Sequence, residues 1–182
     1  MNKFANRVIR AMRLESDLYE EVEADRTATG QAMAVVILAS IAGGIGSGGF
    51  AGLQLQWMFF GALAALGGWV VWAFVTYIVG TKILPTPQTR SNPGELLRTL
   101  GFANSPGLLS IFGLIPILGG LVKLVVPIWI LVAWVIAVRQ ALDYTSTGRA
   151  IAVCLLGWVL YVLIIVFVSG LLGGISNLFG VA

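Results

Sequence analysis

The distribution of charge along the chain constrains its fold more than any other feature of the sequence. No Asp, Glu, Lys or Arg occurs over residues 27–81, residues 99–138 contain only Lys123, and residues 150–182 contain none. These stretches hold 55, 40 and 33 residues, whereas roughly 18 apolar residues already indicate a membrane-spanning helix. Only 10% of all residues are charged, against about a quarter in soluble domains. The sequence therefore predicts an all-α, polytopic transmembrane helical bundle.

Glycine and proline divide these stretches into about five spans. We expect them over residues 30–52, 57–80, 96–119, 121–138 and 150–172. Asn92, Pro93 and Glu95 supply a cap, a first-turn proline and a third-position carboxylate, which predict the start of a helix before the third span. Proline inside a helix removes a backbone hydrogen bond, so the third segment is either one span kinked at Pro106 or an interfacial helix followed by a short span.

Basic residues predict the orientation of these spans. If the N-terminus and alternate loops share one side, that side collects ten of the eleven Lys and Arg residues, and Lys123 stands alone on the other. Such asymmetry favours a cytoplasmic N-terminus and an odd number of spans. The C-terminus is then outside, with residues 1–29 a charged leader and residues 30–182 the membrane domain.

The leader is predicted to be an amphipathic cytoplasmic helix. The four basic residues of its first half, Lys3, Arg7, Arg10 and Arg13, lie on one side of a helical wheel. Phe4, Val8, Leu18 and most other apolar residues lie on the other. This pattern is typical of a helix in the membrane interface, with a break expected near Leu14. A solvated helix beside the membrane is the alternative.

Residue types exclude several classes of site. The chain has no histidine and one cysteine, Cys154, within an apolar run, so it offers no histidine-based catalysis, cysteine cluster or metal site. We predict no catalytic, cofactor-binding or metal-binding residues, and no nucleic-acid partner, since no basic cluster is interleaved with aromatic residues. Membrane lipid is the expected partner of the basic residues, and Arg98, Arg139 and Arg149 are candidate contacts for lipid headgroups.

Small residues in the first span form a candidate helix-packing face. Ser40, Gly44, Gly48 and Gly52 are spaced by four and therefore share one helix face. Such ladders allow helix backbones to approach closely in lipid. The face either packs within the bundle or joins protomers, and both interpretations stay open.

Prolines and glycines also predict broken helices in the third and fourth segments, with Pro106, Gly107, Pro116 and Pro127 as candidate elements. Discontinuous helices bind substrates and ions in transporters. Coupled transporters usually add ionisable residues within their spans, and this chain has none well inside a span. A passive channel or a lipid-handling protein is the corresponding hypothesis.

Several short motifs resemble the Yip family of membrane proteins, which are named for binding Ypt/Rab-type small GTPases. They occur in the family's order and comprise Ser16-Asp17-Leu18-Tyr19-Glu20, residues 100–109, Ile115-Pro116, Ile128-Trp129 and Arg149-Ala150-Ile151. The short leader is similar to the bacterial or archaeal branch, which implies the plasma (inner) membrane of a prokaryote. Glu20-Glu21 follows Tyr19 where the eukaryotic branch usually has Gly-Pro, so GTPase binding is not carried over.

The resemblance implies a non-enzymatic membrane protein with scaffold-like, accessory or trafficking-like interactions. Asp17, Leu18 and Tyr19 are the first candidate contact with a partner. We predict a protein that works by association, either with itself or with another membrane protein, and the passive channel or lipid-handling protein is the alternative.

Overall fold

The computed structural model describes residues 2–48 and 55–178, and the side chains of all of these except 55 and 172–178. Within these ranges every regular element is a helix. The elements are α1 (Lys3–Met12), α2 (Ser16–Ala24), α3 (Ala28–Gly48), α4 (Leu55–Ile78), the π-helix η2 (Val79–Ile83), α5 (Pro93–Phe102), the 3-10 helix η3 (Ser105–Leu114), α6 (Pro116–Ala141) and α7 (Thr147–Leu178).

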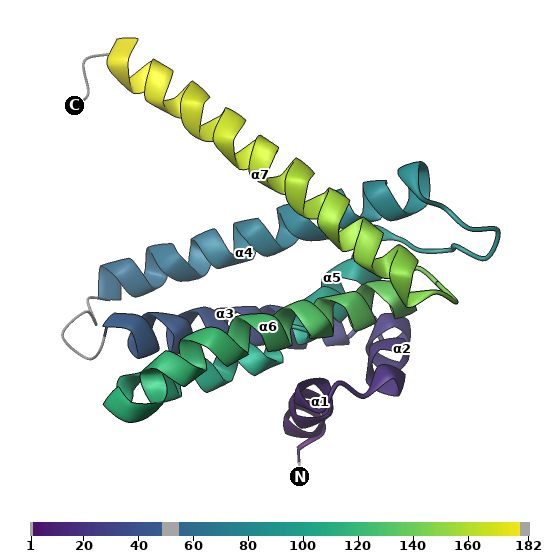
Figure 1. Ribbon diagram of the computed structural model, residues 1–182, viewed down its shortest axis with the longest axis horizontal. Coiled ribbons are helices and arrows are strands. Elements are labelled where there is room, and N and C mark those ends of the chain that lie inside the picture. Colours follow the sequence, from purple (N-terminus) through teal and green to yellow (C-terminus); the bar gives the residue numbers. More distant parts are fainter. Residues whose placement is uncertain (1, 49–54, 179–182) are drawn as a thin grey trace.

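The chain runs along the bundle five times in alternating directions (Figure 1). One end holds α1, α2 and the loops 84–92 and 142–146, and we name it the leader end. The opposite end, where α3 stops and α4 and α6 begin, is the distal end. Among the described residues, four helices are long and apolar enough to cross a membrane: Ala28–Gly48, Gln56–Ile83, Pro116–Ala141 and Thr147–Leu171.

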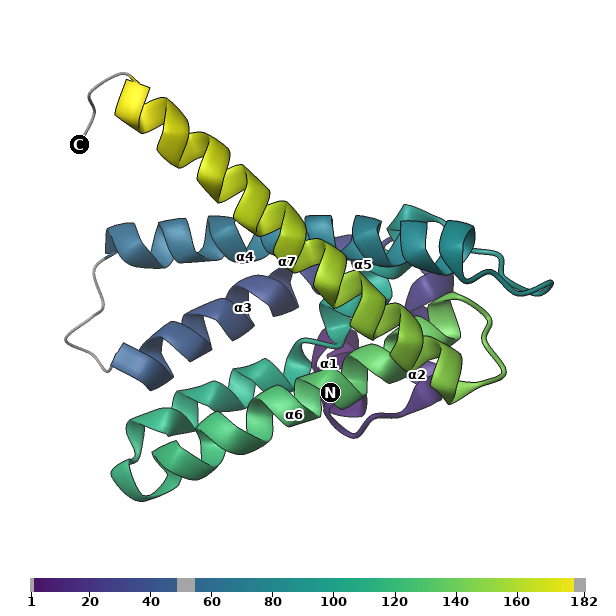
Figure 2. The ribbon, with the colours of Figure 1, turned by 45° about the horizontal axis from the view of Figure 1, so that its top comes forward.

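The third pass is split between α5 and η3. As the sequence predicts, Asn92 caps α5: its Oδ1 accepts from the Glu95 N–H at 3.1 Å, and the Glu95 carboxylate accepts from the Asn92 N–H at 2.9 Å. The α-helix ends at Phe102, and the chain continues as a 3-10 helix with Pro106 in its first turn. Neither part alone is long enough to span a bilayer, but together they run from the leader end to the distal end (Figure 2).

Small residues bring α3 and this third pass into close contact. A Cβ added to the glycines of the third pass would lie 2.6, 3.0 and 2.6 Å from a partner atom on α3. The three contacts pair Gly101 with Ala32, Gly107 with Ala39, and Gly113 with Gly46. We name them the small-residue seam. Residues three apart eclipse one another in a 3-10 helix, so Gly107, Ser110 and Gly113 share one edge of η3.

The leader packs on the bundle as two helices. Leu14 has a positive φ of 61° between α1 and α2, which places the break where the sequence predicts it. Val8, Ala11, Leu18, Tyr19 and Val22 are buried in the core of the protein, with α2 against α5 and α6 and α1 against η3. The prediction that the whole apolar face enters the lipid interface is therefore wrong, because the bundle itself supplies an apolar surface at that place.

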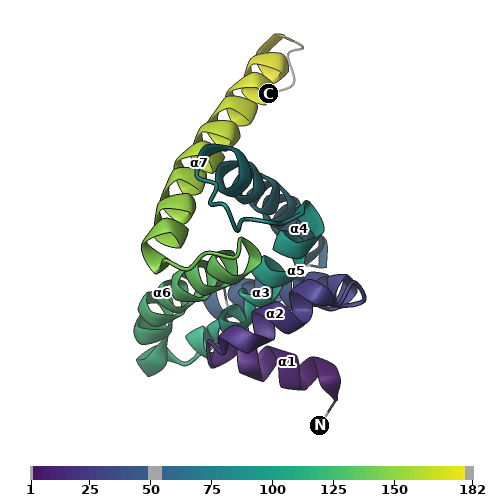
Figure 3. The same cartoon turned by 90° about the vertical axis from the view of Figure 1, so that its right-hand side faces the viewer.

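The last helix leaves the bundle. α7 packs on α4 and α6, and Gly157 lies against Trp72 in this contact. Beyond it α7 diverges from the other helices in every view (Figure 1, Figure 2, Figure 3). Residues 162–171 are exposed at every position, with Leu163 at 59% and Phe167 at 72%.

Candidate functional site

A buried arginine ties the leader helices to α3. Arg7 is 1% exposed, and it donates to the Glu21 Oε1 at 2.8 Å, to the Asp25 Oδ2 at 2.6 Å and to the Gln31 Oε1 at 3.0 Å. Hydrogen bonds from Thr27 and Arg7 hold the pKa of Asp25 below its usual value. Arg10 pairs with Glu15 and Glu21. Lys3 also pairs with Asp25, at 3.3 Å, so the acidic half of the leader pairs with three of the leader's five basic residues.

Arg98 caps the end of α2. Its Nε donates to the Val22 and Glu23 carbonyl oxygens at 2.9 and 3.1 Å, and its Nη2 also donates to Glu23. The last four carbonyls of an α-helix have no intrahelical partner, and Arg98 satisfies two of them. It is only 6% exposed. The expectation that it contacts a lipid headgroup is therefore corrected: in this structure Arg98 is a structural residue.

Arg139 and Arg149 remain near the surface of the leader end. Arg139 donates to the Tyr144 carbonyl at 3.2 Å and to the Thr147 hydroxyl at 3.3 Å. The exposed Arg149 donates to the Pro85 carbonyl at 3.4 Å. The Tyr144 hydroxyl lies 3.1 Å from the Gly80 carbonyl oxygen and 2.7 Å from that of Leu84, and its one proton is shared between them. These bonds fasten the loops at the ends of η2 and α6 to each other.

An acidic surface cavity of about 900 Å³ lies beside these loops at the leader end. Its carboxylates come from two helices, α2 and α5, and the loop after α6, namely Glu20, Glu23, Glu95 and Asp143. Burial, together with the like charges of Glu95 and Asp143, raises the pKa of Glu23 to about 7. Within residues 2–48 and 55–178, no group of three His, Cys, Asp or Glu residues could hold a metal ion.

The predicted partner contact is largely buried. Leu18 and Tyr19 are 0% exposed, and burial raises the pKa of the Tyr19 hydroxyl. Asp17 alone of the three faces outward. The expectation that all three meet a partner is corrected accordingly, because the helical period turns Leu18 and Tyr19 toward the core while Asp17 stays on the other face.

Two glycines of the predicted ladder, Gly44 and Gly48, point away from the bundle. Gly44 and Gly48 are exposed, and no described atom lies within 4 Å of a Cβ built on either. Ser40 donates to the Ile37 carbonyl of its own helix at 2.8 Å, and Gly52 lies outside the described residues. Close packing within the chain occurs instead at Gly46, where a Cβ would overlap the Ser110 carbonyl oxygen. The alternative of packing inside the bundle is therefore corrected for Gly44 and Gly48.

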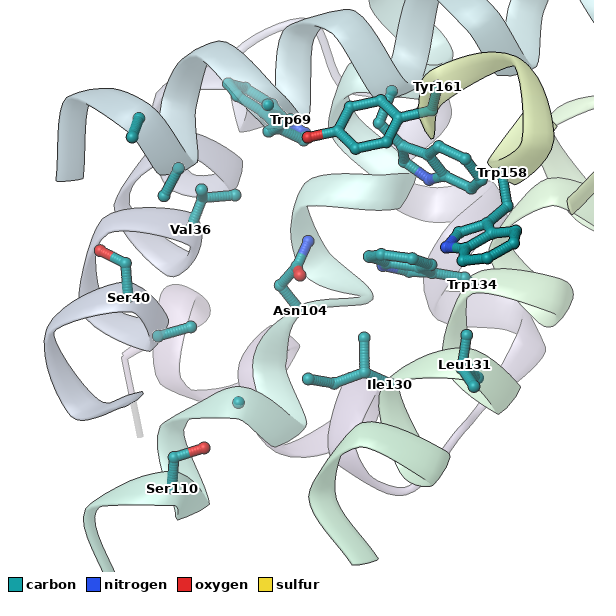
Figure 4. A pocket seen from close by; sticks show the side chains of 16 residues that line it. Val36, Ser40, Trp69, Asn104, Ser110, Ile130, Leu131, Trp134, Trp158 and Tyr161 are labelled. Carbon is teal, nitrogen blue, oxygen red and sulfur yellow. The ribbon is translucent and has the colours of Figure 1, made fainter. Parts of the chain in front are cut away.

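A second cavity, of about 470 Å³, lies midway along the bundle and is shown in Figure 4. It is bounded by α3, α4, the third pass, α6 and α7, next to the point where α7 diverges. Of the predicted broken-helix elements, Gly107 lines it and Pro106 is buried, while Pro116 and Pro127 are exposed on α6. The broken third pass thus reaches this cavity, and the two prolines of α6 do not.

The sequence matches the Yip1 domain over residues 11–179. This chain belongs to the Yip1 family. No curated protein and no solved structure matches it. Yip1-family proteins are non-catalytic membrane proteins that interact with other proteins. The resemblance stated from the short motifs is therefore confirmed, and the match extends into the leader and along the whole of α7.

The architecture of this Yip1-family chain depends on residues that the sequence analysis did not single out. Arg7 and the seam residues Ala32, Ala39 and Gly46 are the main ones. The seam has a readable signal, since its α3 members are spaced by seven and therefore share a helix face. The partners of Arg7 have no such signal, because they lie on α2, on the residue after it and on α3, and are specified by tertiary packing.

Proposed function

We propose that this Yip1-family chain works by association within the membrane, with a second copy of itself or with another membrane protein. The observation that supports this best is the outer half of α7. Residues 162–171 are apolar or small and exposed on all faces, so they make no close packing contacts with the rest of the described chain. In lipid, helices associate through close packing rather than through the hydrophobic effect, and a divergent helix offers its whole circumference to a partner.

The exposed glycines of α3 add a second surface. Gly44 and Gly48 leave the backbone of α3 open to close approach, and this face is not used by the chain's own helices. We propose that it receives a helix of the partner. The sequence left two interpretations of this ladder, packing within the bundle and packing between protomers. Because Gly44 and Gly48 do not pack within the bundle, we propose that the ladder packs between protomers.

The distribution of Lys and Arg supports an orientation of the leader and the membrane domain in the membrane. Most Lys and Arg residues lie at the leader end, and Lys123 lies near the distal end on α6. This asymmetry supports a cytoplasmic leader over residues 1–29, a membrane domain over residues 30–182 and an external C-terminus in a prokaryotic plasma membrane. GTPase binding through residues 17–19 is not proposed, because two of the three side chains are buried.

Leucine substitutions on α3 test the association. Gly44→Leu and Gly48→Leu, alone and together, fill the open face without touching the chain's own core. We expect the assembly that is extracted from native membranes to become smaller or to lose its second protein. Gly120→Leu is the matched control, because Gly120 is also exposed, has no described atom within 4 Å of its Cβ position and lies near the distal end on α6. Unchanged assembly size in the double variant contradicts the proposal.

Lipid handling is the second candidate function, and the mid-bundle cavity is the observation that favours it. The cavity is bounded by the broken third pass, as the lipid-handling hypothesis requires. Its test is lipid movement between the leaflets of liposomes that contain the purified protein. Filling the cavity should slow that movement, and a rate equal to that of protein-free liposomes contradicts this function.

A further inference from the structure

The mid-bundle cavity combines an apolar wall with a few uncharged polar groups. Its volume of about 470 Å³ lies within the roughly 300–1,000 Å³ that is usual for small-molecule sites. Most of its lining is aliphatic or aromatic, including Trp134 and Trp158. The polar side chains are Ser40, Asn104, Ser110 and Tyr161. None of the lining residues is Asp, Glu, Lys or Arg, so the site favours a ligand without charge.

Asn104 is the central polar group of this cavity. It follows the turn that ends α5, and its side chain projects into the middle of the space (Figure 4). Its Nδ2 donates to the Leu100 carbonyl at 2.8 Å. Among the described residues the Oδ1 atom has no protein donor, so it can accept a hydrogen bond from a ligand, and the second N–H of the amide can donate one.

The depth of the cavity restricts the ligand further. The lining residues of α3 and α4, such as Val36 and Gly68, are close to the midpoints of their helices. A phospholipid headgroup lies at the surface of a hydrocarbon core that is about 30 Å thick, and a charge at mid-depth is costly. The ligand must therefore carry its polar oxygen atoms without charge inside the hydrocarbon.

The wall beside α7 gives such a ligand an entry route. Trp158 is 56% exposed although it lines the cavity, and α7 diverges just beyond it. Tyr161 packs edge-on against Trp72 at 5.9 Å between ring centroids, so the aromatic side of the cavity is held in place. A long lipid chain can extend from the cavity between α4 and α7 into the bilayer.

From this geometry we infer that the mid-bundle cavity binds an uncharged lipid that carries hydroxyl or carbonyl oxygen atoms, with Asn104 and Tyr161 as its hydrogen-bonding partners. Diacylglycerols and isoprenoid quinones share this chemistry. The inference uses the cavity of the second candidate function, but binding does not require movement. Retention of the lipid without movement between leaflets supports the site and refutes lipid handling.

Competitive lipid retention tests the site. The purified full chain is equilibrated with equal amounts of a diacylglycerol, an isoprenoid quinone, a phosphatidylcholine and a hydrocarbon of similar length, and bound lipid is measured by native mass spectrometry. We expect about one diacylglycerol or quinone per chain, and the species retained identifies the source. Retention of phosphatidylcholine or hydrocarbon to the same extent, or of no lipid at all, overturns the inference.

Variants separate this site from general contact with lipid. Ala65→Phe fills the cavity from α4 and should lower retention about tenfold or more. Ala152→Phe is the matched control on the lipid-exposed surface of α7, outside the cavity, and should retain the lipid. Asn104→Leu keeps a similar volume and removes the amide, so it should lower retention of the oxygen-bearing lipid about threefold or more. Equal retention by all four proteins overturns the inference, and unchanged assembly size in Ala65→Phe shows that association is independent of it.

Discussion

A single methyl group at Gly46 should destabilise the fold more than the same group anywhere on the exposed glycine face. A Cβ at Gly46 would overlap the Ser110 carbonyl oxygen and lie 2.8 Å from its carbonyl carbon. Both neighbours are backbone atoms, so no side-chain rotation relieves the overlap. α3 and η3 must separate, and that separation also loosens the contact of Gly46 with Gly113.

The size of the effect follows from two opposing contributions. Overpacking in a well-packed core costs about 1–3 kcal/mol. Replacing glycine by alanine inside a helix returns about 1 kcal/mol. Gly46→Ala should therefore lower the free energy of unfolding by up to about 2 kcal/mol. Gly44→Ala has the same helix benefit with no described atom within 4 Å, so it should raise the free energy of unfolding by about 0.5–1 kcal/mol.

Equilibrium unfolding in mixed micelles measures both variants. The fraction of SDS is increased, and tryptophan fluorescence follows the transition of the wild type, Gly44→Ala and Gly46→Ala. The expected midpoints rank Gly44→Ala above the wild type and the wild type above Gly46→Ala. Equal stability of the two variants would refute the reasoning, because it would mean that α3 and η3 are not in backbone contact at the small-residue seam.

Three further predictions concern the leader end. Arg98→Gln should release α2 from the bundle, since a hydrogen bond to a charged group contributes about 1.5–3 kcal/mol, and faster proteolysis within residues 1–26 would show it; unchanged protection contradicts the capping role. Tyr144→Phe should lower the free energy of unfolding by about 1 kcal/mol, because it removes the single hydroxyl proton that the Gly80 and Leu84 carbonyls share; the same SDS titration measures it, and an unchanged midpoint contradicts it. A carboxyl group whose pKa is raised on folding binds more protons in the folded state. The contribution of Glu23 to the free energy of unfolding should therefore be fully present below its unfolded pKa, and it should be lost as pH rises through about 7. After allowance for its partial exposure this contribution is on the order of 1–2 kcal/mol, and Glu23→Gln should remove that part of the pH dependence between pH 5 and 8; an identical pH profile in wild type and variant contradicts it.

The membrane architecture could be predicted because it depends on local properties. Long stretches without charged residues predict the passes, and proline and the cap at Asn92 act on the backbone within a few residues. The passes and the start of α5 therefore follow from the sequence. The break at Leu14 follows in the same way, since the apolar face is interrupted there. The family resemblance rests on equally local motifs, and the match over residues 11–179 confirms it.

The wrong expectations concern which surface each helix face meets. The apolar face of the leader fits lipid and protein equally well by hydropathy, and only the fold places it on α5, α6 and η3. The ladder with Gly44 and the seam with Gly46 lie on one helix, two residues apart. Periodicity identifies both faces, but the conformation of the third pass decides that Gly46 packs inside the bundle.

Arg98 shows the same limit for charged residues. Near a predicted helix end, an arginine that reaches the lipid headgroups and an arginine that caps another helix look alike in sequence. The difference depends on where α2 ends, which is set by contacts between residues about 75 positions apart. A local sequence pattern does not indicate which residues so far apart in the chain will be in contact.

The most direct test of the proposed association is native mass spectrometry of the protein extracted gently from its own membranes at native abundance. Association predicts a stoichiometric second chain, either another copy or a different membrane protein, that is lost when Gly44 and Gly48 are both replaced by leucine and is retained in Gly120→Leu. A single chain carrying only lipid, in wild type and in both variants, would contradict the account.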